Sequence, residues 1–116
     1  MFKLNPAPEF IAPALLSAYG QDQRQELQVR WRHKSHTALQ AWLEGGRNRS
    51  SLEFVGEVIA DMTGLVDADG QAVPYTPAVL ADLLNNFHSA GSELIEAYIA
   101  ALQEGRRKNS LRPPAA

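Results

Sequence analysis

The chain has 116 residues, a formal net charge of -2 and no cysteine, with 45% hydrophobic and 21% charged residues. These values are typical of one globular domain with a substantial core, and the lack of cysteine excludes disulfides, thiol nucleophiles and thiolate metal sites. No apolar run approaches the roughly 20 residues that a membrane-spanning helix needs, and the N-terminus lacks a signal-peptide pattern, so we expect a cytoplasmic protein.

Two strands are expected in the first third of the chain. Residues 2–14 carry three prolines, which limits this segment to an edge strand or an extended arm. Apolar and polar side chains alternate over residues 27–33, which is the period of a half-buried strand. We therefore predict an antiparallel hairpin that pairs residues 10–18 with residues 27–33 across a turn at Tyr19 to Asp22.

A first helix is expected directly after the second strand. Ser35 or Thr37 can cap its N-terminus, and Gly45-Gly46 predicts its end. Its inward face consists of Leu39, Trp42 and Leu43. The periodicity of the chain thus changes from that of a strand to that of a helix near Ser35.

A second helix is expected to begin at a capping box. Ser50 would accept a hydrogen bond from the backbone at Glu53, whose side chain would reach back to the start of the helix. The apolar stripe that follows predicts a helix as far as Thr63-Gly64. The stripe consists of Leu52, Val55, Val58, Ile59 and Met62.

The next segment joins a tight turn to the start of a third helix. Asp67, Asp69 and Gly70 favour a turn, because short carboxylates bond nearby backbone N–H groups and glycine tolerates positive φ. Thr76-Pro77 predicts a helix with threonine as its N-cap and proline in its first turn. Apolar residues then recur at helical spacing to about Phe87.

A fourth helix is expected from about Ser89 to Gly105. Its apolar side consists of Leu94, Ile95, Tyr98, Ile99 and Leu102. We predict an α+β fold in which a small N-terminal antiparallel hairpin or sheet is followed by about four helices. Residues 1–105 would form a single domain, and residues 106–116 a flexible, solvated C-terminal tail.

A resemblance to a known family extends from Phe2 to about Asn109 and is carried by four segments. One is the D-x-D-G turn at residues 67–70, which leads through V-P-Y-T-P into a leucine-paired helix. The others are F-K-L-N-P-A-P-E-F, V-R-W-R-H-K-S-H-T-A-L-Q-A-W-L-E and E-F-V-G-E-V-I-A-D-M-T-G-L. Together they resemble the tail assembly chaperones of long-tailed, siphovirus-like bacteriophages and prophages.

This resemblance implies a non-enzymatic chaperone without a cofactor. Such chaperones coat the apolar, aggregation-prone tape measure protein during tail assembly, yield as tube subunits polymerise, and are absent from the finished virion. The expected partners are therefore the tape measure protein and, in addition, the tail tube protein, in the cytoplasm of the bacterial host. The resemblance also implies that this chain is the shorter of two products, the longer arising from a ribosomal frameshift near Lys108-Asn109.

Basic residues give the main candidate binding surface. Arg30, Arg32 and Lys34 alternate along the polar side of the second strand, where they would present a positive stripe to an acidic partner or to phosphate. A solvated strand face is the plainer interpretation of the same pattern. The candidate partner-binding residues are Arg30, Arg32, Lys34, Arg106, Arg107 and Lys108.

The alternative interpretation is a small nucleic-acid-binding module. It would use Arg30, Arg32, Arg47, Arg49 and the cluster at residues 106–108. The acidic net charge and the lack of a helix-turn-helix pattern weigh against it, so we do not expect nucleic acid as a partner.

Catalytic, metal and cofactor sites are not expected. His33 and His36 lack further ligands, and the Asp67 to Gly70 turn lacks the later oxygen ligands of a calcium loop. Neither a G-x-S-x-G nucleophile elbow nor a glycine-rich phosphate loop occurs. Asp82 and Glu93 lie on expected polar helix faces, where a carboxylate is ordinarily solvated.

Overall fold

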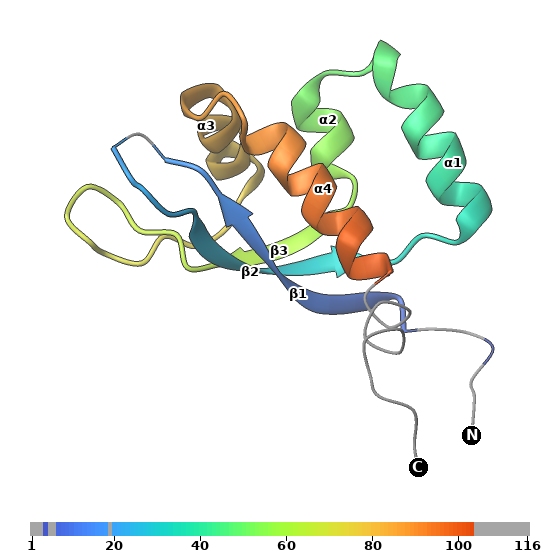
Figure 1. Ribbon diagram of the computed structural model, residues 1–116, viewed down its shortest axis with the longest axis horizontal. Helices are drawn as coiled ribbons and strands as arrows, with labels where there is room; N and C mark the ends of the chain where they lie inside the picture. The colour runs from blue at the N-terminus through green and yellow to red at the C-terminus, as the bar shows by residue number, and fades with distance from the viewer. Residues whose placement is uncertain (1–3, 5–6, 19, 104–116) are drawn as a thin grey trace.

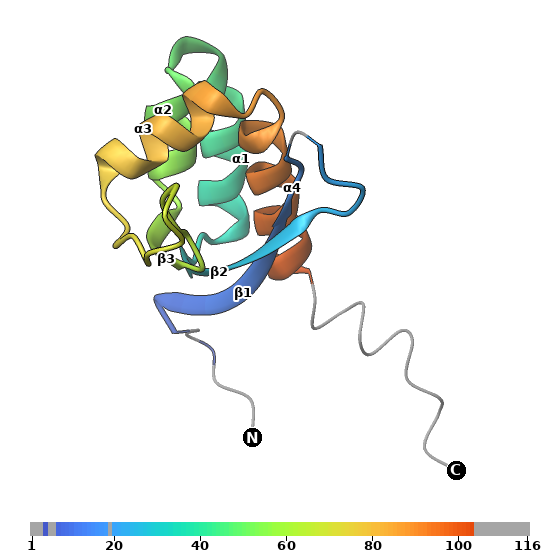
Figure 2. The ribbon, with the colours of Figure 1, turned by 90° about the vertical axis from the view of Figure 1, so that its left-hand side faces the viewer.

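The structure is a computed structural model that describes residues 4, 7–18 and 20–103. Its elements are β1 (Glu9–Leu16), β2 (Gln25–Arg32), α1 (His36–Gly45), a 3-10 turn (Gly46–Asn48), α2 (Ser51–Gly56), β3 (Ile59–Thr63), α3 (Pro77–Asn86) and α4 (Ala90–Leu102). The strands form one antiparallel sheet in the order β1-β2-β3, and the helices lie on one face of it, as Figure 1 and Figure 2 show. The predicted α+β class is confirmed, while the expected tail at 106–116 lies outside the described residues.

The predicted hairpin is formed by β1 and β2. Phe10 lies opposite Trp31 in an antiparallel register that extends from Glu9 to Leu16. The connecting turn contains Gly20 with a φ of 74°, a conformation that glycine adopts without strain. Val29 and Trp31 point toward the helices and are buried, as the alternation of apolar and polar residues in the sequence predicts.

The second predicted helix is wrong in its second half. The helix α2 ends at Gly56, and the residues that follow form β3, the second edge of the sheet. Ile59 lies opposite Trp31 and Met62 opposite Val29, with a register shift between the two pairs. Because that irregularity adds one residue to β3, Ile59 and Met62 both face the core although they are three positions apart, which is also the spacing of a helix.

The first helix begins and ends where the sequence predicts. The Ser35 hydroxyl accepts a hydrogen bond from the Ala38 N–H at 3.1 Å. Trp42 is buried, but Leu43, which we assigned to the inward face, is 37% exposed, since α1 touches the core along only a narrow strip. Gly46 follows the helix with a φ of -64°, so its role is not a left-handed cap.

The need for glycine at position 46 comes from the lack of space around it and not from its backbone angle. A Cβ atom placed there would lie 2.6 Å from the ring of Phe54. That ring stacks on Trp42 with 4.1 Å between the centroids, and the Trp42 indole N–H donates to the Phe54 carbonyl at 2.9 Å. Glycine therefore lets the turn between α1 and α2 close against a fixed aromatic pair.

The caps of the remaining helices follow the sequence in part. The Ser50 hydroxyl accepts from the Glu53 N–H at the start of α2, and the Thr76 hydroxyl accepts from the Val79 N–H at the start of α3. Ser89 precedes α4, but its hydroxyl donates to the Glu93 carboxylate instead of capping the backbone. The helix boundaries are thus set mainly by short polar side chains.

Tyr98 of α4 lies at the centre of the core. Its ring centroid is 5.3 Å from that of Trp31 and 5.5 Å from that of Trp42. The Tyr98 hydroxyl donates to the Arg32 carbonyl oxygen at 2.7 Å. Burial raises the pKa of Tyr98 to about 12, so the phenol remains a hydrogen-bond donor throughout the neutral range. This residue joins α4 to both α1 and the sheet.

Candidate functional site

The face of the sheet away from the helices is uncovered in the part of the chain that the structure describes (Figure 2). On this face β1 presents Ile11, Pro13 and Leu15, of which Ile11 is 67% and Leu15 45% exposed. Arg30 of β2 lies directly opposite Ile11 and is exposed too. An apolar row and a cation are therefore neighbours on an open surface.

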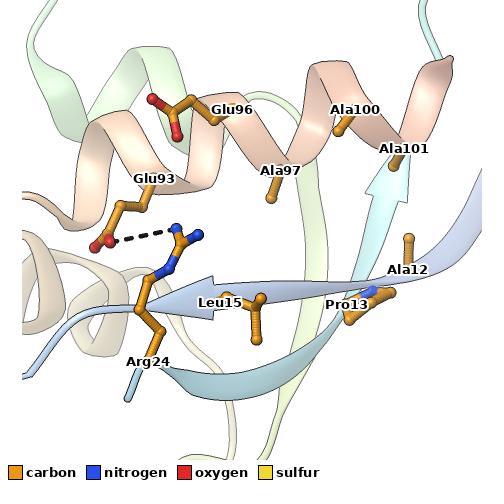
Figure 3. Close-up of a pocket in the computed structure, with 9 residues that line it drawn as sticks. All are labelled: Ala12, Pro13, Leu15, Arg24, Glu93, Glu96, Ala97, Ala100 and Ala101. Atoms are coloured by element: carbon orange, nitrogen blue, oxygen red, sulfur yellow. Dashed lines mark ion pairs between the residues drawn. The ribbon is translucent and has the colours of Figure 1, made fainter. Parts of the chain in front are cut away.

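A groove of about 330 Å³ lies on the other side of β1, between this strand and α4. Figure 3 shows alanines along most of its length and charged side chains at one end. Its lining residues are Ala12, Pro13, Leu15, Arg24, Glu93, Glu96, Ala97, Ala100 and Ala101. Because Pro13 and Leu15 belong both to this groove and to the open sheet face, one continuous surface passes around β1.

Glu93 at the charged end of the groove is not solvated, contrary to the sequence interpretation. Its carboxylate accepts hydrogen bonds from the Ser17 N–H at 3.0 Å, the Ser17 hydroxyl at 2.6 Å and the Ser89 hydroxyl at 3.0 Å, and it lies 3.7 Å from the Arg24 guanidinium. Burial acts to raise the pKa of Glu93, but the bonds from Ser17 and Ser89 and the charge of Arg24 outweigh it and leave the pKa below its ordinary value. Glu93 therefore anchors the end of β1 to α4 as an anion.

Of the three cations predicted on the second strand, Arg30 and Arg32 lie on β2, whereas Lys34 lies beyond its end, which corrects the prediction for that residue. The Arg32 guanidinium donates to the Ile59 carbonyl at 2.7 Å, so it holds the bend between α2 and β3. Lys34 forms an ion pair with Glu57, which also pairs with Arg49 at 2.7 Å. Arg30 makes no side-chain hydrogen bond or ion pair with the described residues. The remaining candidates, Arg106, Arg107 and Lys108, lie outside the described part of the chain.

The ion pairs of Glu57 with Lys34 and Arg49 predict that the stability of the fold depends on pH. The hydrogen bonds from Lys34 and then Arg49 hold the pKa of this carboxyl below its ordinary value of 4.5. A lowered pKa in the folded state stabilises the fold above about pH 4.5, and this contribution is lost as the pH falls through the folded-state pKa. Since Glu57 is partly exposed, Glu57→Gln should cost less than about 1 kcal/mol at pH 7.

Urea unfolding at several pH values checks this expectation. The difference between Glu57→Gln and the unaltered protein should shrink as the pH is lowered from 7 to 3, because both proteins then lack the charge. Glu44→Gln, at an exposed carboxylate on α1, serves as the control and should change little at any pH. A difference that stays constant or grows toward low pH would contradict the assignment.

Motifs that could suggest other chemistry have plain structural roles. The Asp67 carboxylate accepts from the Asp69 and Gln71 N–H groups, and Gly70 has a φ of 79°, which makes the D-x-D-G segment a turn. No group of three or more His, Asp or Glu side chains in the described residues is placed to hold a metal ion. Among the same residues, no helix is long and apolar enough to cross a bilayer.

The uncovered surface around β1 exposes apolar side chains, which is typical of protein interaction sites. A family model described as phage tail assembly chaperone matches residues 1–109. The chain belongs to this family. No curated protein and no solved structure is significantly similar to it. Phage tail assembly chaperones are not enzymes, and membership of this family implies tail proteins as partners and action in the host cell.

The sequence interpretation missed the groove of this tail assembly chaperone. It assigned Leu94, Tyr98 and their neighbours on α4 to the core, but it gave no role to the alanines between them. The pairing of β1 with α4 joins segments about 80 positions apart, for example Ser17 with Glu93 at a separation of 76 residues. The only sequence signal was the run of small residues at 97, 100 and 101, which is equally typical of a closely packed helix.

Proposed function

We propose that this chaperone binds the tape measure protein in the bacterial cytoplasm, keeps it soluble and yields it as tail tube subunits assemble around it. The family match supports a role in tail assembly, and the uncovered row of Ile11, Pro13 and Leu15 supports binding of an apolar client. Exposed apolar surface of this kind is typical of protein interaction sites. The chaperone would then be released and would not be part of the finished virion.

Reversible binding is the proposed mechanism. An apolar row of three side chains on an open sheet buries limited area, which favours an interaction that later subunits can displace. Arg30, beside Ile11, would contribute a charge contact at the rim, with more effect on the rate of association than on final affinity. Arg106, Arg107 and Lys108 are proposed as further contacts. Arg32 and Lys34 already bond to other groups of the fold, so they would contribute only through the long-range electrostatic field of their charges.

Co-expression with the tape measure protein of the same phage tests this function. We expect the tape measure protein to be soluble and to co-purify with the chaperone, and to aggregate when it is expressed alone. Insoluble tape measure protein in both cases, with no complex, would overturn the proposal.

The contribution of Arg30 to binding can be tested separately. Arg30→Glu should slow association with the tape measure protein severalfold at low salt, because it reverses a charge at the rim of the apolar row. Arg47→Glu, at an exposed arginine in the 3-10 turn after α1, makes the same charge change away from this face. Equal effects of the two variants would show that only net charge matters.

A further inference from the structure

We infer that the groove between β1 and α4 is where the chaperone binds the tape measure protein, and that the bound segment is an amphipathic α-helix with a lysine or arginine near Glu96. This inference rests on the proposed function and specifies its site. The groove has about 330 Å³ of space and is continuous with the apolar row on the open sheet face. It can therefore take the side chains of one face of a helix while the rest of that helix stays outside.

The wall that α4 contributes suits a helix. Ala97, Ala100 and Ala101 are spaced by three and four positions, so their methyl groups lie on one side of α4. Small side chains at a contact let two helix axes approach to about 8 Å, the short end of the usual range. Ala100 is exposed, and the groove beside it is not filled by the described residues. A second helix can thus lie against α4 without any rearrangement of the core.

The wall that β1 contributes disfavours an added strand. The Pro8 carbonyl accepts from the His33 N–H, so the even-numbered residues of β1 turn their backbone groups toward β2. Ile11, Pro13 and Leu15 then turn theirs toward the free edge of the sheet, where proline has no N–H to donate. A strand added to this edge would have one carbonyl, opposite Pro13, without a hydrogen-bond donor. Proline at such a position is a common protection of edge strands against further pairing.

The charged end of the groove favours a cation on the bound helix. Glu93 is already paired with Arg24, whereas Glu96 is exposed and forms no ion pair with the described residues. The two carboxylates and one guanidinium give this end a net negative charge, and the other lining residues carry none. A cation of the partner would be favoured there, and a carboxylate would be repelled.

Matched leucine substitutions test the site. The tape measure protein of the same phage is titrated against the chaperone and its variants. Ala100→Leu should weaken binding at least tenfold, because the added side chain occupies the groove. Ala41→Leu makes the same change at an exposed position of α1 and should stay within twofold of the unaltered chaperone. Thermal unfolding of both variants checks that they are folded.

Two further variants separate the features of the inference. Glu96→Lys should weaken binding more than Glu44→Lys, and this difference should decrease at high salt. Pro13→Val restores the missing N–H on the strand edge, which only an added strand would use, so binding should not become tighter if the partner is a helix. Binding that becomes tenfold tighter with Pro13→Val would show that a strand is added and would overturn the helix assignment.

The outcomes separate the site from the function. If the unaltered chaperone does not bind the tape measure protein, both the function and the site are overturned. If Ala100→Leu leaves binding intact, the site alone is overturned. The site is also overturned if the chaperone forms a dimer that Ala100→Leu dissociates while tape measure binding is kept.

Discussion

Trp42→Ala should lower the free energy of unfolding by about 3 to 5 kcal/mol, the usual range for removing a large buried aromatic side chain. The indole is 4% exposed, stacks on Phe54 and meets the edge of Tyr98. It is also the main link of α1 to the rest of the core, and its loss leaves the Phe54 carbonyl without its donor. Urea unfolding followed by circular dichroism measures this change.

The neighbouring leucine provides the control. Leu43→Ala removes an apolar side chain from the same helix, but this side chain is 37% exposed, so the cost should be about 1 kcal/mol or less. If the two variants lost similar stability, α1 would pack on the core through a different face from the one described.

Gly46→Ala should destabilise the fold by about 1 to 3 kcal/mol through overpacking. The new methyl group would lie 2.6 Å from the Phe54 ring, which stacks on Trp42. The ring cannot move aside without breaking that stack. Thermal and urea unfolding both report the effect, and a structure of the variant should show the Trp42 and Phe54 rings displaced.

The adjacent glycine separates this steric effect from backbone preference. Gly45 also has a right-handed conformation, with a φ of -76°, but a Cβ atom there would meet nothing within 4 Å. Gly45→Ala should therefore be neutral or stabilise the fold by up to about 1 kcal/mol, since alanine favours a helix over glycine. A loss of stability in both variants would point to the backbone and not to the Phe54 contact.

Features that depend on a few neighbouring residues could be predicted from the sequence. The caps at Ser35, Ser50 and Thr76 each follow from one hydroxyl and the backbone three positions on. The hairpin follows from the alternation of side chains in β2, because one face of that strand is buried and the other is open. In all of these cases the information lies in the residues of the feature itself or close to them in the sequence.

Features that depend on distant pairing could not be predicted in the same way. The extra residue in β3 gives Ile59 and Met62 the spacing of a helix, and only their pairing with β2 shows that the segment is a strand. The same limit applies to the groove, whose walls come from the beginning and the end of the described chain. The partners of Arg32 and Lys34 were missed for a related reason, since the carbonyls and Glu57 that they contact belong to a different element.

The packing of α4 on β1 also determines when this chain can fold during its synthesis. Ser17 and Glu93, which tie the two elements together, are 76 residues apart, and contacts of such long separation form late and slow the folding of a domain. The ribosome makes β1 first, and the buried side of this strand has no cover until α4 has emerged. A nascent chain of this chaperone therefore exposes its own apolar strand for most of its synthesis, and folding is completed only when nearly all of the described chain is present.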